Sequence, residues 1–194
     1  MTVPILPRRQ ASDGLRLETP FHAPVLRTPR LTLRPHRLGD APQWYAIQSD
    51  PEVLRFIPWP ERDALASRRH LLQRTRRTVL CKRHDFLALA VEHDGVLIGD
   101  IGVHLRDVPA ATRTAEISWI IDRRHARHGY AREATSAALE ALVTRLGART
   151  ITARIDEGNE RSITMARRLS FRPTRPGMFV TTADRVVGLA QLTP

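Results

Sequence analysis

The sequence is short of cysteine, lysine and aromatic residues. Cys81 is the single cysteine of the 194 residues, which excludes an intrachain disulfide and a zinc site built from several thiolates. Lys82 is the only lysine, and aromatic residues make up 5% of the chain. No run of ~18 consecutive apolar residues occurs, so the sequence predicts no transmembrane helix. We therefore expect a cytoplasmic enzyme that uses no metal and contacts no membrane.

Arginine, by contrast, is abundant. Lysine and arginine total 31 against 20 aspartates and glutamates, which gives a formal net charge of +11. Such a charge favours anionic partners, although an arginine-rich genome would produce it without any functional cause. The apolar fraction of 42% is that of an ordinary globular protein, and the length fits one domain.

The first residues are rich in proline and show little periodicity. We interpret residues 1–27 as an N-terminal extension that either wraps the domain or stays mobile, and residues 28–194 as one domain. The pair Arg8-Arg9 is not followed by an apolar stretch, so we expect no secretion signal.

Hydrophobic periodicity predicts an alternation of strands and helices, and hence an α/β fold of the mixed or α+β kind. Asp94-Gly95 is a strong signal for a tight hairpin turn. Strands are expected at residues 28–35, 86–91, 96–105, 115–121 and 150–155. Two more are expected in the tail, around the turn Pro176-Gly177 and in the run 185–192. Helices are expected at residues 40–48, 61–80, 129–146 and 159–169, the last capped by Asn159.

A basic segment joins the 115–121 strand to the 129–146 helix. Where a strand leads into a helix, free backbone N–H groups and the positive end of the helix dipole converge. An anion such as pyrophosphate would bind there, with Arg123, Arg124 and Arg127 adding charged contacts. A plain strand-to-helix turn with solvated arginines fits the same residues, so both interpretations remain open.

Two further side chains could carry chemistry. Glu116 opens a strand and suits a proton acceptor, although a carboxylate paired with an arginine is an equal alternative and His104 is a competing base. Ser162 lies on the helix stripe that should face the core. Its hydroxyl either serves a site or completes the cap formed by Asn159.

Taken in order, these segments resemble the GNAT superfamily of acyl-CoA N-acyltransferases, in particular its ribosomal-protein N-terminal acetyltransferases. The resemblance runs from about Thr28 to the C-terminus. It implies a central mixed, mostly antiparallel sheet flanked by helices, with acetyl-CoA between the fourth and fifth strands. The resembling segments are Thr28–Pro35, Asp50–Phe56, Glu116–Ile121, His128–Ala134, Asn159–Ser162 and Ser170-Phe171.

The resemblance also implies roles for single residues. The backbone near Ile120 and Ile121 would bond the pantetheine arm, which Asn159 would also meet. Ser162 would donate a hydrogen bond to the departing thiolate. The implied phosphate site comprises Arg127, His128, Gly129, Tyr130 and Ala131.

The sequence departs from the family pattern at three places. In the phosphate loop, Ala126 replaces a glutamine or arginine and Arg127 stands where glycine is common. A positive φ at Arg127 would be costly. Ser170 replaces the glycine that usually precedes the phenylalanine. Ala166 stands where other members carry a tyrosine acid, which leaves Ser162 as the candidate.

We hypothesise direct attack of an amine on acetyl-CoA in a ternary complex, with Glu116 accepting the proton. A protein N-terminal α-amine is the expected acceptor, because at pH 7 roughly 14% of it is neutral against about 0.04% of a lysine side chain. The alternatives are another acyl-CoA, a small-molecule amine such as an antibiotic, and a non-catalytic module that binds RNA or the ribosome. No RNA-binding motif is recognisable. The protein is expected to be a monomer or a homodimer.

Overall fold

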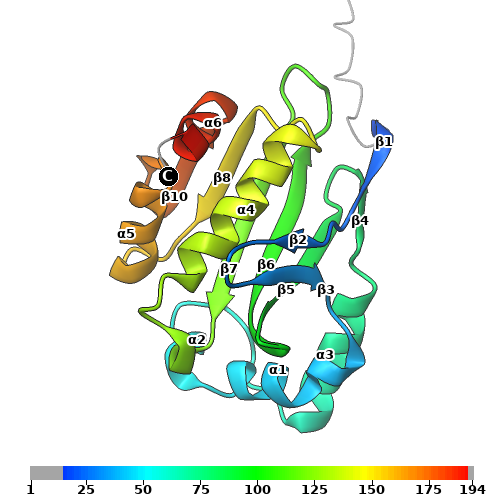
Figure 1. Ribbon diagram of the computed structural model, residues 1–194, viewed down its shortest axis with the longest axis vertical. Coiled ribbons are helices and arrows are strands. Elements are labelled where there is room, and N and C mark those ends of the chain that lie inside the picture. The colour runs from blue at the N-terminus through cyan, green and yellow to red at the C-terminus, as the bar shows by residue number, and fades with distance from the viewer. Residues whose placement is uncertain (1–14, 192–194) are drawn as a thin grey trace, which may run out of the picture.

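The computed structural model describes residues 15–191, which form a curved sheet covered by helices (Figure 1). The strands are β1 (Arg16–His22), β2 (Leu26–Arg27), β3 (Thr32–Pro35), β4 (Val79–Lys82), β5 (Phe86–His93), β6 (Val96–Asp107), β7 (Thr114–Ile121), β8 (Thr150–Arg154), β9 (Arg172–Arg175) and β10 (Met178–Thr182). The helices are α1 (Ala41–Gln48), α2 (Pro51–Leu54), α3 (Ala64–Thr75), α4 (Tyr130–Thr144), α5 (Glu160–Arg168) and α6 (Ala183–Gln191).

The main sheet has eight strands in the order β2-β3-β5-β6-β7-β8-β10-β9. Only β7 and β8 are parallel, and the other neighbouring strands of the described chain pair antiparallel. Pairing between β7 and β8 ends at Glu116 and Thr152, although β7 continues to Ile121. The two strands therefore separate toward their C-terminal ends. This confirms the predicted mixed, mostly antiparallel sheet.

Helices cover both faces of the sheet. Side chains alternate along a strand, so Ala90 of β5 faces a different cluster from its neighbours Leu89 and Val91. Ala90 packs with α1 and α3, whereas Leu89 and Val91 belong to the larger core, which includes the buried side of α4. Figure 1 shows α4 crossing in front of the sheet, with α5 and α6 near β8 and β10.

Several local predictions are confirmed. Asp94 and Gly95 have φ values of 48° and 79° and join β5 to β6, as a tight hairpin turn requires. The predicted helix 129–146 is α4, and Gly147, with φ of 73°, follows its end. Asn159 is the N-cap of α5.

Three predicted elements differ from the structure. Residues 185–191, predicted as a strand, form most of α6, and Leu192 lies outside the described residues. A short apolar run fits both the two-residue period of a strand and the 3.6-residue period of a helix. In the structure one side of this segment is buried, as the exposures of Val186 (5%) and Val187 (46%) show. The 61–80 helix ends at Thr75, after which β-branched Thr78 and Val79 lead into β4. The 28–35 strand begins only at residue 32, because residues 28–31 form a turn.

The described part of the N-terminal extension wraps the domain. β1 pairs antiparallel with β4, and β2 adds an edge strand beside β3. Leu17, Phe21 and Leu26 are buried in the large core. Strand pairing and burial therefore join residues 16–27 to the domain. No helix within residues 15–191 has the length and apolar character needed to span a bilayer.

Candidate active site

A cleft of about 930 Å³ opens where β7 and β8 separate. It is lined by α2, the end of β7, the loop that follows β7, the start of α4 and the first turns of α5. The separation of the two strands thus brings together segments that are far apart in the sequence. The predicted site residues that line the cleft are Ile120, Ile121, Arg127, Gly129, Tyr130, Ala131, Asn159 and Ser162.

The loop between β7 and α4 suits an anion. Gly129 is the N-cap of α4 with φ of 81°, and because it has no side chain, no cap hydrogen bond occupies the first N–H groups of the helix. Tyr130 and Ala131 of this first turn line the cleft. The positive end of this 15-residue helix therefore lies at the cleft, an arrangement that favours an anion such as pyrophosphate.

Arg127 adopts a backbone conformation that is costly for any residue with a side chain. Its φ is 68°, in the left-handed region that glycine adopts without strain. Ser170, the other residue in place of a family glycine, has φ of 61°. At both positions the backbone has the conformation that favours the glycine of the family pattern.

Arginines dominate the charged lining of the cleft. Glu52 and Glu160 are the acidic residues of the lining. The arginines are Arg55, Arg123, Arg127, Arg132, Arg161 and Arg168. Arg123 lies 3.6 Å from a carboxylate oxygen of Asp50.

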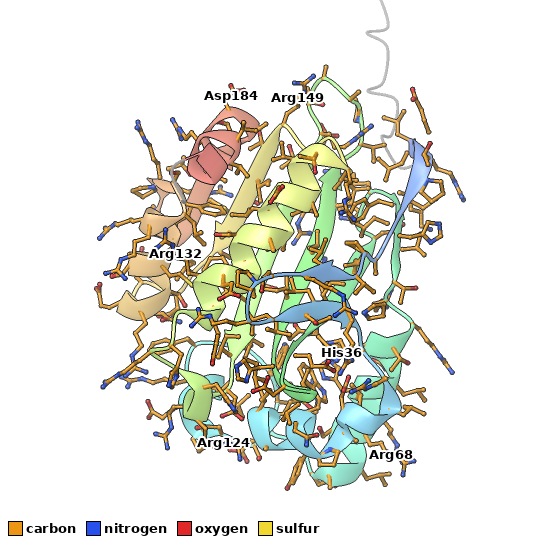
Figure 2. The ribbon with its side chains drawn as sticks, viewed as in Figure 1. His36, Arg68, Arg124, Arg132, Arg149 and Asp184 are labelled. Atoms are coloured by element: carbon orange, nitrogen blue, oxygen red, sulfur yellow. The ribbon has the colours of Figure 1, made fainter. Side chains whose placement is uncertain are left out.

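Four of these guanidinium groups have no partner in the described part of the chain. Within residues 15–191, the side chains of Arg127, Arg132, Arg161 and Arg168 make no hydrogen bond or ion pair. Arg132, labelled in Figure 2, projects from the start of α4. These cations are free to bind the phosphates of a ligand.

Asn159 and Ser162 present two polar groups to the cleft. Oδ1 of Asn159 accepts a hydrogen bond from the backbone N–H of Ser162 at 3.1 Å, so the cap uses the amide oxygen and leaves the NH₂ group for a ligand. The Ser162 hydroxyl has no hydrogen-bond partner among the described residues, and the side chain is partly exposed. Ile163 and Ala166 take the buried side of α5. The backbone of Ser162 therefore completes the cap, and its hydroxyl remains available.

Glu116 lies outside the cleft lining. Its carboxylate accepts two hydrogen bonds from Arg106, at 3.0 and 3.1 Å, and lies 4.0 Å from Nε of Arg154. His104 is its direct partner across β6 and β7. Burial, followed by the charge of Arg106, lowers the pKa of His104, so this imidazole is neutral at pH 7 and can accept a proton.

His128 also lies outside the lining. Its ring stacks on Tyr130 with centroids 5.5 Å apart, and its carbonyl oxygen accepts a hydrogen bond from Arg30 at 2.9 Å. Periodicity gave no sign of these contacts, because Arg30 and His128 are 98 residues apart.

Apolar side chains complete the wall of the cleft. Phe56 and Ile57 after α2, Trp119 of β7 and Met165 of α5 all line it. Trp44, by contrast, is fully buried in the core. Helical spacing from Ser162 would have found Met165, whereas Phe56 could not be separated from core aromatics by sequence. No group of three or more His, Cys, Asp or Glu residues within the described chain could hold a metal ion.

Comparison with known proteins places the fold in a family. The model of the acetyltransferase (GNAT) domain matches residues 30–172. The uncharacterized N-acetyltransferase p20 of Bacillus licheniformis is 29% identical over 148 residues, which cover 76% of this chain and 82% of that protein. The family match includes the cleft loop and α5.

Solved structures show the same fold. RimL, a ribosomal alpha-N-protein acetyltransferase determined with coenzyme A, has a TM-score of 0.64 at 16% identity, covering 85% of this chain and 99% of that one. The spermidine N-acetyltransferase of Vibrio cholerae, determined with CoA and spermine, has a TM-score of 0.66 at 17% identity, covering 82% and 99%. Because the family model covers well over half of the chain, including the loop of the cleft and α5, the chain belongs to the GNAT acetyltransferase family and is an acetyl-CoA-dependent N-acetyltransferase.

Proposed function

We propose that the enzyme acetylates the N-terminal α-amine of a protein by direct attack on acetyl-CoA in a ternary complex. The observation that carries this choice is the charge of the cleft, where six arginines outnumber Glu52 and Glu160. A polyamine or an aminoglycoside carries several positive charges and needs several carboxylates. An α-amine brings one charge at most, and its lower pKa leaves a larger neutral fraction to act as nucleophile.

The donor is held along the cleft. The phosphate groups bind the first-turn N–H groups at Tyr130 and Ala131, with the loop of Arg127, His128 and Gly129 around them. The pantetheine arm runs along the open edge of β7 at Ile120 and Ile121 and meets the free NH₂ group of Asn159. This path places the thioester toward the start of α5.

Transfer then requires one proton acceptor and one donor. As the amine nitrogen bonds the thioester carbonyl carbon, the C–S bond breaks and the nitrogen loses a proton. The Ser162 hydroxyl donates a hydrogen bond to the departing thiolate. Glu116 accepts the proton through water, with neutral His104 beside it as the alternative acceptor. Cys81 of β4 does not line the cleft, so no acyl-cysteine forms.

A panel of acceptors tests the proposal. Peptides with a free N-terminal alanine or serine are compared with the same peptides blocked at the N-terminus but carrying a lysine, and with spermine. We expect acetylation of the free α-amines only, with kcat/KM rising with pH up to an apparent pKa of ~7.8. Faster acetylation of spermine or of the blocked peptides would contradict the proposal.

A further inference from the structure

Arg30, in the turn between β2 and β3, reaches across to the loop before α4. Its Nε and Nη2 atoms lie 2.7 and 2.6 Å from Oε2 of Glu133, and its Nη1 donates to the His128 carbonyl at 2.9 Å. The backbone N–H of Arg30 donates to the other Glu133 oxygen at 3.0 Å. The Arg30 side chain therefore binds both the loop before α4 and the first turn of α4.

Glu133 is fully engaged on its side of this contact. The Thr28 hydroxyl donates to its Oε1 at 2.6 Å. Burial raises the pKa of Glu133, but the hydrogen bonds from Thr28 and Arg30 outweigh it and hold the pKa below its usual value, so the carboxylate stays charged. Hydrogen bonds between charged partners are the strong ones, which makes this a firm attachment.

Tyr130 fixes the loop from a second direction. The guanidinium carbon of Arg30 lies 4.7 Å from the centroid of the Tyr130 ring, and the Tyr130 hydroxyl lies 2.9 Å from Nε2 of His93. His93 ends β5, next to the hairpin turn. The start of α4 is thus held between the N-terminal strands and the β5–β6 hairpin.

The loop needs such support because of Arg127. A non-glycine residue with φ of 68° favours a different backbone, so neighbouring contacts must hold the loop in shape. We propose that Arg30 is a positioning residue that holds the loop of Arg127, His128 and Gly129 open for the pyrophosphate of the donor. This inference rests on the proposed role of that loop in donor binding. Arg30 itself does not line the cleft and acts through the loop.

A double-mutant cycle that combines substitutions of Arg30 and Arg127 tests the proposal. Calorimetry at about 150 mM salt measures the CoA affinity of each variant. Arg30→Gln should weaken CoA binding about tenfold, because hydrogen bonds to a charged group are lost. In an Arg127→Gly background the loop adopts its shape without help, so Arg30→Gln should weaken binding by less than about threefold. The turnover of Arg30→Gln at saturating acetyl-CoA should change little.

The control is Arg37→Gln, which removes another exposed arginine that pairs with a carboxylate, that of Glu92. Neither Arg37 nor Glu92 lines the cleft. This substitution should leave CoA affinity unchanged. If Arg30→Gln unfolds the protein, Thr28→Val removes one hydrogen bond to Glu133 and should weaken CoA binding by a smaller factor in the same direction.

The outcomes separate this inference from the proposed function. Equal CoA affinity of the wild type and Arg30→Gln would overturn the positioning role and leave the donor site intact. An equal loss in both backgrounds would also overturn it, because Arg30 would then act through its charge and not through the loop. A wild-type protein that does not bind CoA would instead refute the donor site itself.

Discussion

The arginines of this protein fall into two groups that differ in what balances their charge. Arg74, in the last turn of α3, donates to both carboxylate oxygens of Asp100, at 2.9 and 3.0 Å, and Arg34 donates to Asp40 at 2.7 and 3.0 Å. The free arginines of the cleft, such as Arg127 and Arg168, have no carboxylate among the described residues. An arginine paired inside the protein stabilises the fold, whereas an unpaired one in a cleft offers its charge to a substrate.

The ion pair of Arg74 and Asp100, in the group of paired arginines, is buried away from water. Asp100 is 2% exposed, and its Oδ1 also accepts a hydrogen bond from Nε2 of His36 at 2.7 Å (His36 is labelled in Figure 2). Burial raises the pKa of Asp100, but the charge of Arg74 and the bond with His36 outweigh it and lower the pKa. The rings of Trp44 and Trp59 lie within 5.1 and 5.4 Å of the Arg74 guanidinium. Removing one partner here leaves a charge that water cannot solvate.

The largest expected effect on stability comes from breaking the buried ion pair of Arg74 and Asp100. Asp100→Asn should lower the free energy of unfolding by about 3–5 kcal/mol, because Arg74 keeps a buried charge without a counter-ion. Urea denaturation measures the loss. Glu140→Gln, at an exposed carboxylate of α4, is the control and should change stability by less than about 0.5 kcal/mol. Equal stability of Asp100→Asn and the wild type would remove the distinction between the two groups.

In the cleft, a substitution should instead affect the reaction. Ser162→Ala should lower kcat by at least about tenfold while CoA affinity changes by less than about twofold, because the thiolate loses its hydrogen-bond donor only as the C–S bond breaks. Steady-state kinetics and calorimetry measure the two effects. Ser136→Ala, an exposed hydroxyl on α4, should change neither. An unchanged kcat in Ser162→Ala would remove the role assigned to this hydroxyl.

A smaller effect should appear in the acid range. Burial, followed by the charges of Arg74 and Arg62, lowers the pKa of His70 to about 4. Since the unfolded chain takes up this proton near pH 6.5, the contribution of His70 to stability is complete above that pH and is lost as the pH falls toward 4. Thermal unfolding of His70→Gln should therefore show about 1–2 kcal/mol less acid destabilisation, after allowance for solvent screening. Parallel pH curves for variant and wild type would contradict this.

The smallest effect concerns backbone strain. Ser170→Gly should raise the free energy of unfolding by about 0.5–1 kcal/mol, since glycine adopts the φ of 61° without steric cost, although its unfolded chain is more flexible. Ser170→Ala keeps the Cβ atom and should bring no gain, so comparing the two variants by denaturation separates backbone strain from loss of the hydroxyl.

Much of the fold could be predicted from local sequence. The hairpin at Asp94-Gly95 and the cap at Asn159 depend on neighbouring residues, and both are confirmed. The prediction of a strand at residues 185–192 was wrong, because a short apolar segment fits both a strand and a helix. Tertiary packing favours the helix α6 here.

Only the part of the site that depends on neighbouring residues in the sequence could be predicted. Residues of the loop and of α5 follow a sequential pattern, and most of them line the cleft. The ion pair of Glu116 with Arg106 depends on strand register, and the contact of Arg30 with Glu133 joins residues 103 positions apart. Such contacts are set by the packed structure, so periodicity could not reveal them.

Donor binding in the cleft is tested most directly by calorimetric titration of the wild-type protein with acetyl-CoA at about 150 mM salt, compared with CoA and with adenosine 3′,5′-bisphosphate. The salt concentration matters because a protein of charge +11 attracts any polyanion when screening is weak. We expect saturable one-to-one binding in which the pantetheine and acetyl parts add affinity. Acetyl-CoA binding no tighter than the bisphosphate would contradict this expectation.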